Sequence, residues 1–421
     1  MKMKTALWTS VGLATALTGG VGTAFGAGFY LPEVGSPASL GTAGVANPTN
    51  TYSADASWTN PAGMTGIDDQ QVLTGLQVAV PKIEFDVKGV ESRGLRPVTG
   101  DDGGNAGIVT PIPSFFYVKP VSDDVRFGFS LTGPLGGGVD YGNRFAGRYS
   151  VQNVVLGAAA ITPSLSYKVN EKLSIGGGLT VLYTFLNEKI AVRQPGGVGD
   201  ATVSFSDLTS WGVQANLGLT YEFTDRFMLG VVYRSQADTD LEGDLNVYNW
   251  RLPVLPPDEI KISWTNPQWL EAGISFDLND KMTLFANLGW QEWSKFSENE
   301  LSVDSSNEVQ VLDRNWDDTW HTGVAMVYQL TDRSHFSLGA AYESSPVKDA
   351  YRTFDFPVDE MWKLSAAYGW SHEDNLRFAV GTTIYFVGDA SIDQTSQGVR
   401  VTGEYSSNKF AIVGATLRYE F

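Results

Sequence analysis

The sequence contains no cysteine among its 421 residues, and only three histidines. No disulfide framework can therefore brace the fold. Basic residues are also scarce, with 29 Lys and Arg against 47 Asp and Glu and a net charge of −18, which disfavours nucleic acid as a partner. Beyond the amino-terminal segment, no stretch reaches the roughly 18 consecutive apolar residues that a membrane-spanning helix needs.

The amino-terminal segment has the three parts of a secretory signal. Lys2 and Lys4 precede an apolar run that ends near Leu17. Ala24-Phe25-Gly26 then forms a small-x-small cleavage site before Ala27. The sequence therefore predicts a signal peptide over residues 1–26 and an exported mature chain.

The carboxy-terminal residues 409–421 alternate between two faces. Apolar and small residues occupy one face: Ala411, Val413, Ala415, Leu417, Tyr419 and Phe421. The other face holds Ile412, Gly414, Thr416, Arg418 and Glu420. A period of two with lipid-facing apolar residues indicates one strand of a closed transmembrane barrel, in which every backbone polar group is paired. The terminal aromatic residue resembles the signal that outer-membrane barrels present to the barrel-assembly machinery.

Connections of two alternating lengths separate the strands. Short polar turns lie at 120–124, 169–172, 223–226, 278–281, 330–333 and 371–375. Longer connections lie near 89–110, 136–152, 188–206, 240–259, 296–316, 346–357 and 389–407. This asymmetry is typical of outer-membrane barrels and predicts an all-β transmembrane barrel of about 14 antiparallel strands over residues 70–421. A soluble sandwich or propeller also has short alternating strands, but does not usually combine them with a signal peptide and a terminal Phe.

Residues 27–69 show little strand character and carry two motifs, Ala27-Gly28-Phe29 and Asn60-Pro61-Ala62-Gly63. Further motifs follow along the chain: Gly147-Arg148-Tyr149, Pro163-Ser164-Leu165-Ser166-Tyr167, Tyr233-Arg234-Ser235, Trp293-Ser294-Lys295-Phe296, Asp318-Thr319-Trp320 and Ser344-Ser345-Pro346-Val347. In this ordered set the chain resembles the outer-membrane transporters of long-chain fatty acids and other hydrophobic compounds, of the FadL/TodX type. The resemblance implies that residues 27–69 form a hatch inside a 14-strand barrel.

Apolar side chains also occur in the inward phase of two strands, with Phe285 on one and Phe410 and Ile412 on the last. A water-filled porin needs a polar inner wall, whereas this lumen suits a hydrophobic ligand better. Alternatively, these side chains pack the hatch against the wall.

The resemblance implies a passive route in four steps: capture between the third and fourth extracellular loops, transfer to an internal pocket, a shift of the hatch and lateral exit through a kinked third strand. Trp250, Leu252 and Leu255 in the fourth loop are the candidate capture residues. That loop could instead fold down onto the barrel mouth.

Gly133 and Pro134 are the candidate lateral gate, because proline removes a ladder donor from the third strand. A plain strand end would explain this pair equally well. Asn60, Pro61 and Ala62 of the hatch are expected to meet the gate inside the barrel.

Fatty-acid members of the family hold the ligand carboxylate with basic side chains, and a buried carboxylate needs such a partner. Arg193 and Arg314 are the candidates here, although Asp317 stands where the family typically has a base. This departure keeps neutral aromatic or aliphatic hydrocarbons open as ligands.

Other classes of function are less well supported. His321, His335 and His372 accompany no Ser/His/acid pattern and no metal-ligand spacing, so we expect no enzyme activity, no cofactor and no metal. An acidic run at Asp238, Asp240, Glu242 and Asp244 could bind Ca²⁺, but reads better as a solvated surface. A structural or adhesion barrel remains a second alternative. The expected partners are a hydrophobic small molecule, outer-membrane lipid and lipopolysaccharide.

Overall fold

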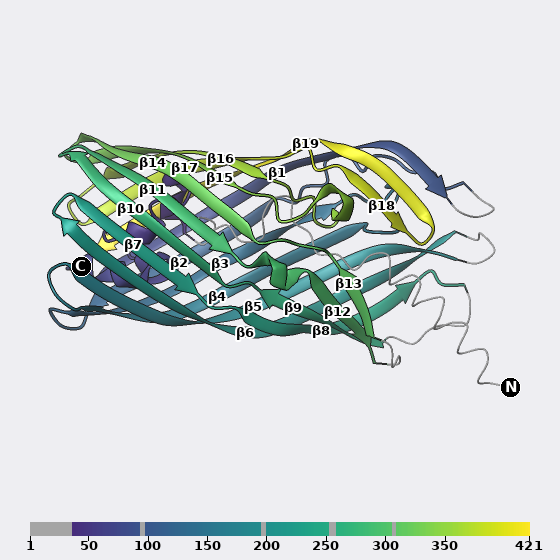
Figure 1. Ribbon diagram of the computed structural model, residues 1–421, viewed down its shortest axis with the longest axis horizontal. Coiled ribbons are helices and arrows are strands. Elements are labelled where there is room, and N and C mark those ends of the chain that lie inside the picture. Colours follow the sequence, from purple (N-terminus) through teal and green to yellow (C-terminus); the bar gives the residue numbers. More distant parts are fainter. Residues whose placement is uncertain (1–35, 93–96, 195–198, 252–257, 305–308) are drawn as a thin grey trace.

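The computed structural model describes residues 36–92, 97–194, 199–251, 258–304 and 309–421, which form a closed antiparallel β-barrel (Figure 1). Fourteen strands make the wall within these ranges, as the sequence predicts. Their bounds are β1 Gln71–Ser92, β2 Thr110–Pro120, β3 Val125–Asp140, β4 Asn153–Lys168, β5 Leu173–Arg193, β6 Asp200–Thr224, β7 Phe227–Arg234, β10 Trp269–Asn279, β11 Met282–Gln291, β14 Thr319–Thr331, β15 Ser334–Glu343, β16 Met361–Ser371, β17 Leu376–Val387 and β19 Val399–Glu420.

The barrel closes where the first strand meets the last. β1 and β19 pair along their whole length, from Gln71 opposite Glu420 to Ser92 opposite Val399. Every other wall strand pairs with its two neighbours in the ring. The wall therefore has no free edge, as a chain that crosses lipid with strands requires.

The two ends of the barrel differ, as the connection lengths predict. All six short turns lie at one end, the turn end, together with the C-terminus (Figure 1). The long connections lie at the other end, the loop end, where five further strands extend the sheet beyond the wall. These are β8 Ala237–Tyr248, β9 Asp258–Asn266, β12 Glu298–Val303, β13 Val309–Asp313 and β18 Ile392–Ser396. The sequence predicted irregular loops here, and the extra strands are a correction.

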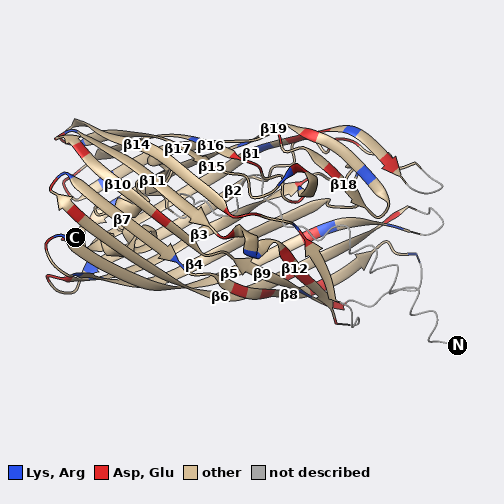
Figure 2. Cartoon of the chain, in the orientation of Figure 1, with Lys and Arg blue, Asp and Glu red and all other residues tan. Residues whose placement is uncertain are grey.

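Alternation along each strand separates a lipid-facing surface from a packed interior. On β19, Val413 is 53% exposed while the adjacent Ile412 is 1% exposed. Leu364 on β16 and Ile384 on β17 also face outward, as their phase predicts. Charged residues gather at the turns and over the loop half, and the wall between them is mostly uncharged (Figure 2). This is the pattern of a barrel with an apolar outer band.

The segment before β1 lies inside the barrel toward the turn end (Figure 1). We call residues 36–69 the hatch. It consists of short helices: η1 Pro37–Thr42, η2 Asn47–Thr49, α2 Ala56–Thr59 and η3 Pro61–Gly66. No helix in the described ranges is long and apolar enough to cross a membrane. The bounds 27–69 stay a prediction, because Ala27, Gly28 and Phe29 lie outside the described residues.

Glycines on the inner wall meet the hatch on ten strands, and we call this set the glycine ring. Its members are Gly75, Gly128, Gly176, Gly218, Gly230, Gly273, Gly323, Gly339, Gly381 and Gly414. A Cβ added at any of them would contact a hatch atom. Glycine inside a strand costs about 0.5–1 kcal/mol relative to alanine, so it commonly marks a place where another backbone approaches closely.

Candidate functional site: an inner pocket beside an interrupted wall strand

The wall is interrupted on β3. The ladder between β2 and β3 runs only from Pro120 opposite Arg126 to Phe115 opposite Leu131. On the other side of the strand, the register with β4 shifts at Gly133 and Pro134, between Thr132 and Leu135. Pro134 has no N–H, so it cannot continue a ladder.

Beyond the interruption the strand continues to Asp140, and β3 is again bonded toward the β1–β2 connection. Ile108 donates to the carbonyl of Gly138 over 3.1 Å, and Gly107 bridges to Val139. The reading of Gly133 and Pro134 as a plain strand end is therefore wrong. Between the two bonded regions, no ladder pairing joins described residues of β2 and β3, and the wall has a bounded gap there.

An apolar pocket lies on the inner side of this interruption. Pro134 and Leu135 form part of its lining, and Trp58 from the hatch forms another part. The remaining lining residues are Ala158, Leu182, Gln214, Trp264, Thr265, Asn266, Pro267 and Trp293. None of the described residues that line this inner pocket carries a charge, and three of them are tryptophans. Such a surface suits an apolar group of a ligand.

Trp58 is held in place by a buried arginine. The guanidinium carbon of Arg234 lies 3.7 Å from the ring centre of Trp58 and 5.2 Å from that of Trp269. The same side chain donates to the carbonyl of Trp58 over 2.8 Å, and Asn216 donates to that carbonyl over 3.3 Å. The sequence analysis missed Arg234, although alternation with Val232 on β7 would have placed it inside the barrel.

The Asn60-Pro61-Ala62 motif does not meet Gly133 and Pro134, contrary to expectation. The Asn60 amide donates to the carbonyls of Pro48 and Leu219, over 2.6 and 3.3 Å. Pro61 and Ala62 instead lie against Gly176 on β5. The hatch contacts β3 at Gly128, and Pro134 lies six residues further along, about 20 Å at ~3.3 Å per residue.

Arg314 lies in the interior, as predicted, but its charge is already paired. It is 7% exposed and forms an ion pair of 3.0 Å with Asp355, which is 4% exposed. Its Nε donates to Asn299, and its guanidinium carbon lies 4.6 Å from the ring centre of Phe356. A ligand carboxylate would therefore have to compete with Asp355 for this arginine.

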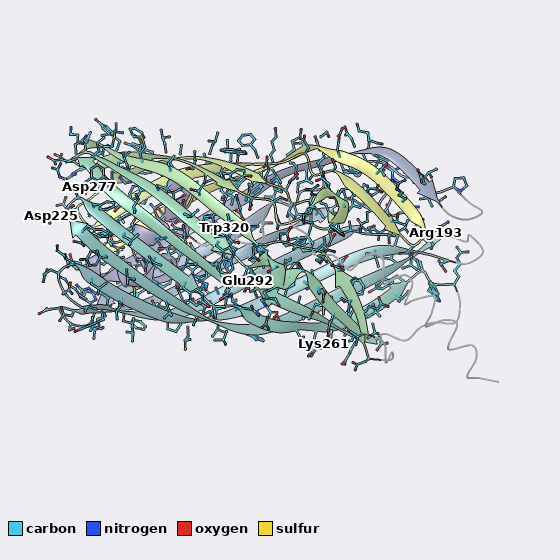
Figure 3. All side chains as sticks on the ribbon, viewed as in Figure 1. Arg193, Asp225, Lys261, Asp277, Glu292 and Trp320 are labelled. Atoms are coloured by element: carbon cyan, nitrogen blue, oxygen red, sulfur yellow. The ribbon has the colours of Figure 1, made fainter. Side chains whose placement is uncertain are left out.

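Arg193 lies at the loop end, far from the middle of the wall that Glu292 and Trp320 mark in Figure 3. Its main-chain N–H and its guanidinium bond to Gln397, over 3.0 and 3.4 Å. Strict alternation places this position outward, and the alternation of β5 continues past Leu186, because the extra residue of the register shift there lies on β6. The bulge that would have turned Arg193 toward the lumen is therefore not on its own strand.

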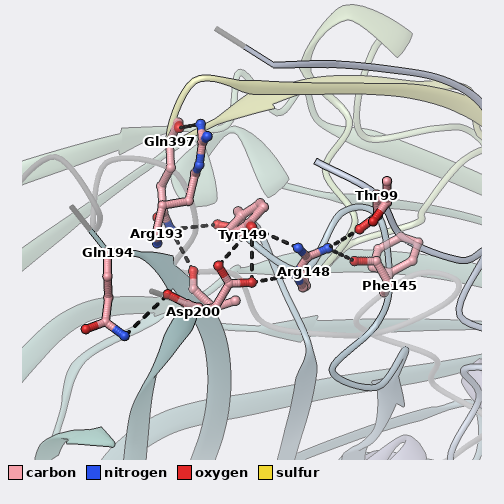
Figure 4. A network of polar contacts seen from close by, with 10 residues as sticks. Thr99, Phe145, Arg148, Tyr149, Arg193, Gln194, Asp200 and Gln397 are labelled. Atoms are coloured by element: carbon pink, nitrogen blue, oxygen red, sulfur yellow. Dashed lines mark hydrogen bonds and ion pairs between the residues drawn. The ribbon is translucent and has the colours of Figure 1, made fainter. Parts of the chain in front are cut away.

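Arg193 belongs to a polar network at the loop end (Figure 4). In it, Arg148 forms an ion pair of 2.9 Å with Asp200, and Tyr149 donates to the same carboxylate over 3.0 Å. The pKa of the Tyr149 phenol is raised to about 12, and burial is the largest cause. The phenol therefore stays protonated and remains a donor at neutral pH.

Trp250 lines a second, open pocket at the loop end. Its other lining residues come from the third connection and from the fourth: Gln194, Gly199, Asp200, Asn249 and Arg251. This outer pocket is more polar than the apolar groove expected. Trp250 also packs against a large buried hydrophobic cluster that includes Phe145, Trp264 and Trp293, as a loop folded onto the barrel mouth would. Leu252 and Leu255 lie outside the described residues.

Phe285, Phe410 and Ile412 face inward as predicted, but the hatch covers them. Phe410 and Ile412 cluster with Leu40 of the hatch. Phe285 clusters with Val45. Of the two readings of the apolar lumen, packing of the hatch accounts for these three residues.

His321 and two residues of the acidic run have charged neighbours. The Nε2 of His321 lies 3.7 Å from the carboxylate of Glu271, and its ring occupies the space over Gly289. Lys261 forms ion pairs with Asp240 and Glu242, over 2.6 and 3.4 Å. Among the described residues, no three His, Asp or Glu side chains are placed to hold a metal ion together.

Comparisons with known proteins bear on the whole chain. Residues 18–421 match the family described as outer membrane protein transport protein (OMPP1/FadL/TodX). The chain is 23% identical to the long-chain fatty acid transport protein of Salmonella typhi, over all of both chains. It is 22% identical to outer membrane protein P1 of Haemophilus influenzae, over 97% of this chain and 98% of that one.

Solved structures of similar fold include a FadL homologue of Pseudomonas aeruginosa, with a TM-score of 0.83 and 22% identity over 94% of this chain and all of that one. The toluene transporter TodX of Pseudomonas putida gives a TM-score of 0.66 and 18% identity, over 96% of this chain and all of that one. At these identities the likeness supports the fold alone.

Proposed function

Because the chain belongs to the OMPP1/FadL/TodX family of outer-membrane transporters of hydrophobic compounds, we propose that it admits long-chain fatty acids or related hydrophobic molecules by passive diffusion. The observation that carries the proposal is the gap in the wall at Pro134, which opens beside an apolar inner pocket whose floor is Trp58. A ligand in that pocket can reach the membrane without crossing the hatch.

The proposed route has three stages. At the loop end, which faces outward in barrels of this kind, the outer pocket at Trp250 and the loop residues Leu252 and Leu255 capture the ligand. The ligand then passes along the large buried hydrophobic cluster into the inner pocket, since Trp264 and Trp293 belong to both. It leaves between β2 and β3 at Gly133 and Pro134.

The driving force is partition into lipid, because each buried CH₂ group contributes about 0.8 kcal/mol. The hydrocarbon interior of the membrane is the more favourable environment for the ligand. In this proposal the protein lowers the free-energy barrier to ligand movement from the aqueous surface into that interior. The concentration gradient of the ligand sets the direction of net movement. This role uses binding and shape, and needs no catalytic group.

A neutral hydrocarbon is the second candidate ligand. Two observations favour it: the described lining of the inner pocket is uncharged, and Arg314 is already paired with Asp355. Arg193 lies at the rim, so it could read a carboxylate only at the capture stage.

An uptake panel tests the proposal. A strain that lacks this protein is compared with the same strain carrying it, using oleate, a long-chain alkane and a monoaromatic hydrocarbon at low concentration. Faster uptake of at least one of the three with the protein present is expected. Equal rates for all three in both strains would favour the structural or adhesion barrel.

A further inference from the structure

We propose that Lys82 and Lys409, the lysine pair, bind a phosphate group of lipopolysaccharide in the outer leaflet of the membrane. The pair lies on the outer face of the barrel, where β1 and β19 close the wall. The inference concerns the lipid that surrounds the protein, so it does not depend on which hydrophobic ligand the barrel admits.

The two lysines stand directly opposite each other on adjacent strands, as register partners in the β1–β19 ladder. Both are exposed, and they continue the outward phase of Val80 on β1 and Val413 on β19. Like charges directly opposite each other on a sheet destabilise it. An anion held between the two ammonium groups would replace this repulsion with attraction.

The lysine pair marks the loop-side border of the uncharged outer band. Outward positions carry no charge from Val72 to Val80 on β1, or from Tyr419 to Ala411 on β19. Lys82 lies ten residues beyond Val72, which is about 33 Å along the strand at ~3.3 Å per residue. On a strand tilted by about 40° this rises about 25 Å along the barrel axis, the height of the apolar band in outer-membrane barrels. The pair therefore lies at the level where lipid headgroups begin.

Aromatic side chains on the neighbouring strands support this level. Phe386 on β17 stands opposite Lys409, and Trp362 on β16 stands opposite Phe386. Both rings are exposed on the outer wall, and Tyr342 packs against Trp362 with ring centres 4.9 Å apart. Aromatic residues gather in this way at the interface between membrane and water. They place the lysine pair at that interface independently of the strand length.

Neither lysine has a strong competing partner. Within the ranges that the structure describes, the side chain of Lys409 makes no hydrogen bond or ion pair. Lys82 pairs with Glu84 over 3.0 Å, but these side chains are 52% and 37% exposed, and such surface ion pairs contribute little. Further toward the loop end, Arg400 already pairs with Asp393 over 2.7 Å.

A lipid phosphate suits the lysine pair in charge and in position. A phosphate monoester carries a charge of about −1.5 to −2 at neutral pH and three acceptor oxygens, so two ammonium groups can bind it together. Lysine stems can lie along an apolar wall while their ammonium groups stay at headgroup level. The acyl chains of the bound lipid would then lie along Val80 and Val413. A free phosphate ion would gain nothing from that apolar surface.

Affinity for lipid A, the phosphorylated anchor of lipopolysaccharide, tests the site. The purified barrel in detergent is titrated with diphosphoryl lipid A and with its dephosphorylated form, and bound lipid is measured by native mass spectrometry. We expect Lys82→Gln with Lys409→Gln to bind the phosphorylated lipid about twentyfold more weakly than the wild type, since each lysine beside an anionic lipid contributes about fivefold.

Lys88→Gln with Arg400→Gln is the matched control on the same two strands, because acidic side chains already pair with both cations. It should bind as the wild type does. Two results would overturn the proposal: equal binding of both lipids to the wild type, or an unchanged preference for the phosphorylated lipid in the variant of the lysine pair.

A charge reversal separates lipid binding from a structural role. Lys409→Glu places an acid opposite Lys82, so this variant should be at least as heat-resistant as the wild type in lipid-free detergent. It should nevertheless lose the preference for phosphorylated lipid A, and lower heat resistance would contradict the proposal. Inorganic phosphate in large excess should leave the complex with lipid A intact. Displacement by inorganic phosphate would show a site for a free ion and refute the assignment to a lipid.

Discussion

The guanidinium carbon of Arg234 lies 3.7 Å from the ring centre of Trp58, and the same arginine holds the carbonyl of that tryptophan. A cation over an indole face contributes about 0.5–2 kcal/mol, with the larger value where water is excluded. Arg234 is 1% exposed, so water is excluded and the larger value applies. The floor of the inner pocket is thereby fixed by a residue that does not line the pocket itself.

Replacing Arg234 with Lys is expected to weaken ligand binding in the inner pocket about threefold to thirtyfold. Lysine keeps the charge but loses the planar surface and the fork of donors that hold Trp58. Binding of a fluorescent fatty acid to the purified protein measures the effect. Arg226→Lys, at an exposed turn where Arg226 pairs with Asp280, is the control. Equal affinity in both variants would mean that Trp58 needs no such support.

Replacing Pro134 with Val should slow uptake by about tenfold while leaving binding to the inner pocket unchanged. Valine restores a backbone donor and favours the strand, so β3 can bond to β2 across the gap. A tenfold change corresponds to about 1.4 kcal/mol on the exit step. Pro163→Val on β4 is the control, because Pro163 pairs opposite Phe129 away from the gap. Undiminished uptake with Pro134→Val would rule out exit at this place.

Charge selection is tested at Arg314 together with Asp355. Removing Arg314 alone would leave a buried carboxylate unpaired, at a cost of about 3–5 kcal/mol, so both residues are changed to Ala. If Arg314 binds the ligand carboxylate, oleate affinity should fall about tenfold to hundredfold, since charge-assisted hydrogen bonds contribute about 1.5–3 kcal/mol. An alkane should bind as before. Arg193→Ala makes the same comparison at the rim, and equal losses for both ligands would contradict charge reading.

Capture is tested in the fourth loop. Changing Trp250, Leu252 and Leu255 to Ser should lower uptake at low ligand concentration and leave the rate at saturation unchanged. Each apolar side chain contributes about 1.5–3 kcal/mol when fully buried against a ligand. Val309→Ser with Val311→Ser removes apolar surface from another loop-end strand and serves as the control. Uptake lost equally in both variants would point to the loops in general and not to this site.

The wall could be predicted from the sequence because its physics is local. Each wall strand faces lipid on one side and the packed interior on the other, so its side chains alternate with a period of two. The positions of Val413 and Ile412 in that alternation are enough to assign them to the outer and the inner face. The six short connections could be predicted from their Asn, Asp and Ser residues, which favour turns. The loop-end strands escaped prediction because β8 and β9 carry charges such as Asp240 and Lys261 in place of a lipid-facing stripe.

The site was less accessible to sequence reasoning, because it depends on which residues the hatch covers. The sequence made Phe410 a candidate for contact with a ligand, but in the structure it clusters with Leu40 of the hatch. Asn60 was expected at Gly133, and it bonds at Leu219 because the hatch lies below the interruption. Alternation along the strands could have placed Arg234 and the ring glycines on the inner face of the wall. Their contacts with the hatch could be identified only in the folded structure.

The seam between β1 and β19 also joins the two ends of the wall sequence. Gln71 bonds to Glu420 across 349 positions of sequence, and Phe421 donates to the carbonyl of Gln70. Contacts of such separation form late, because the intervening chain must first be brought together. The hatch precedes every strand of the wall in the sequence, and the ring of strands around it is complete only when β19 pairs with β1. A chain truncated before β19 would lack the strand that pairs with both β1 and β17, so its wall could not close around the hatch.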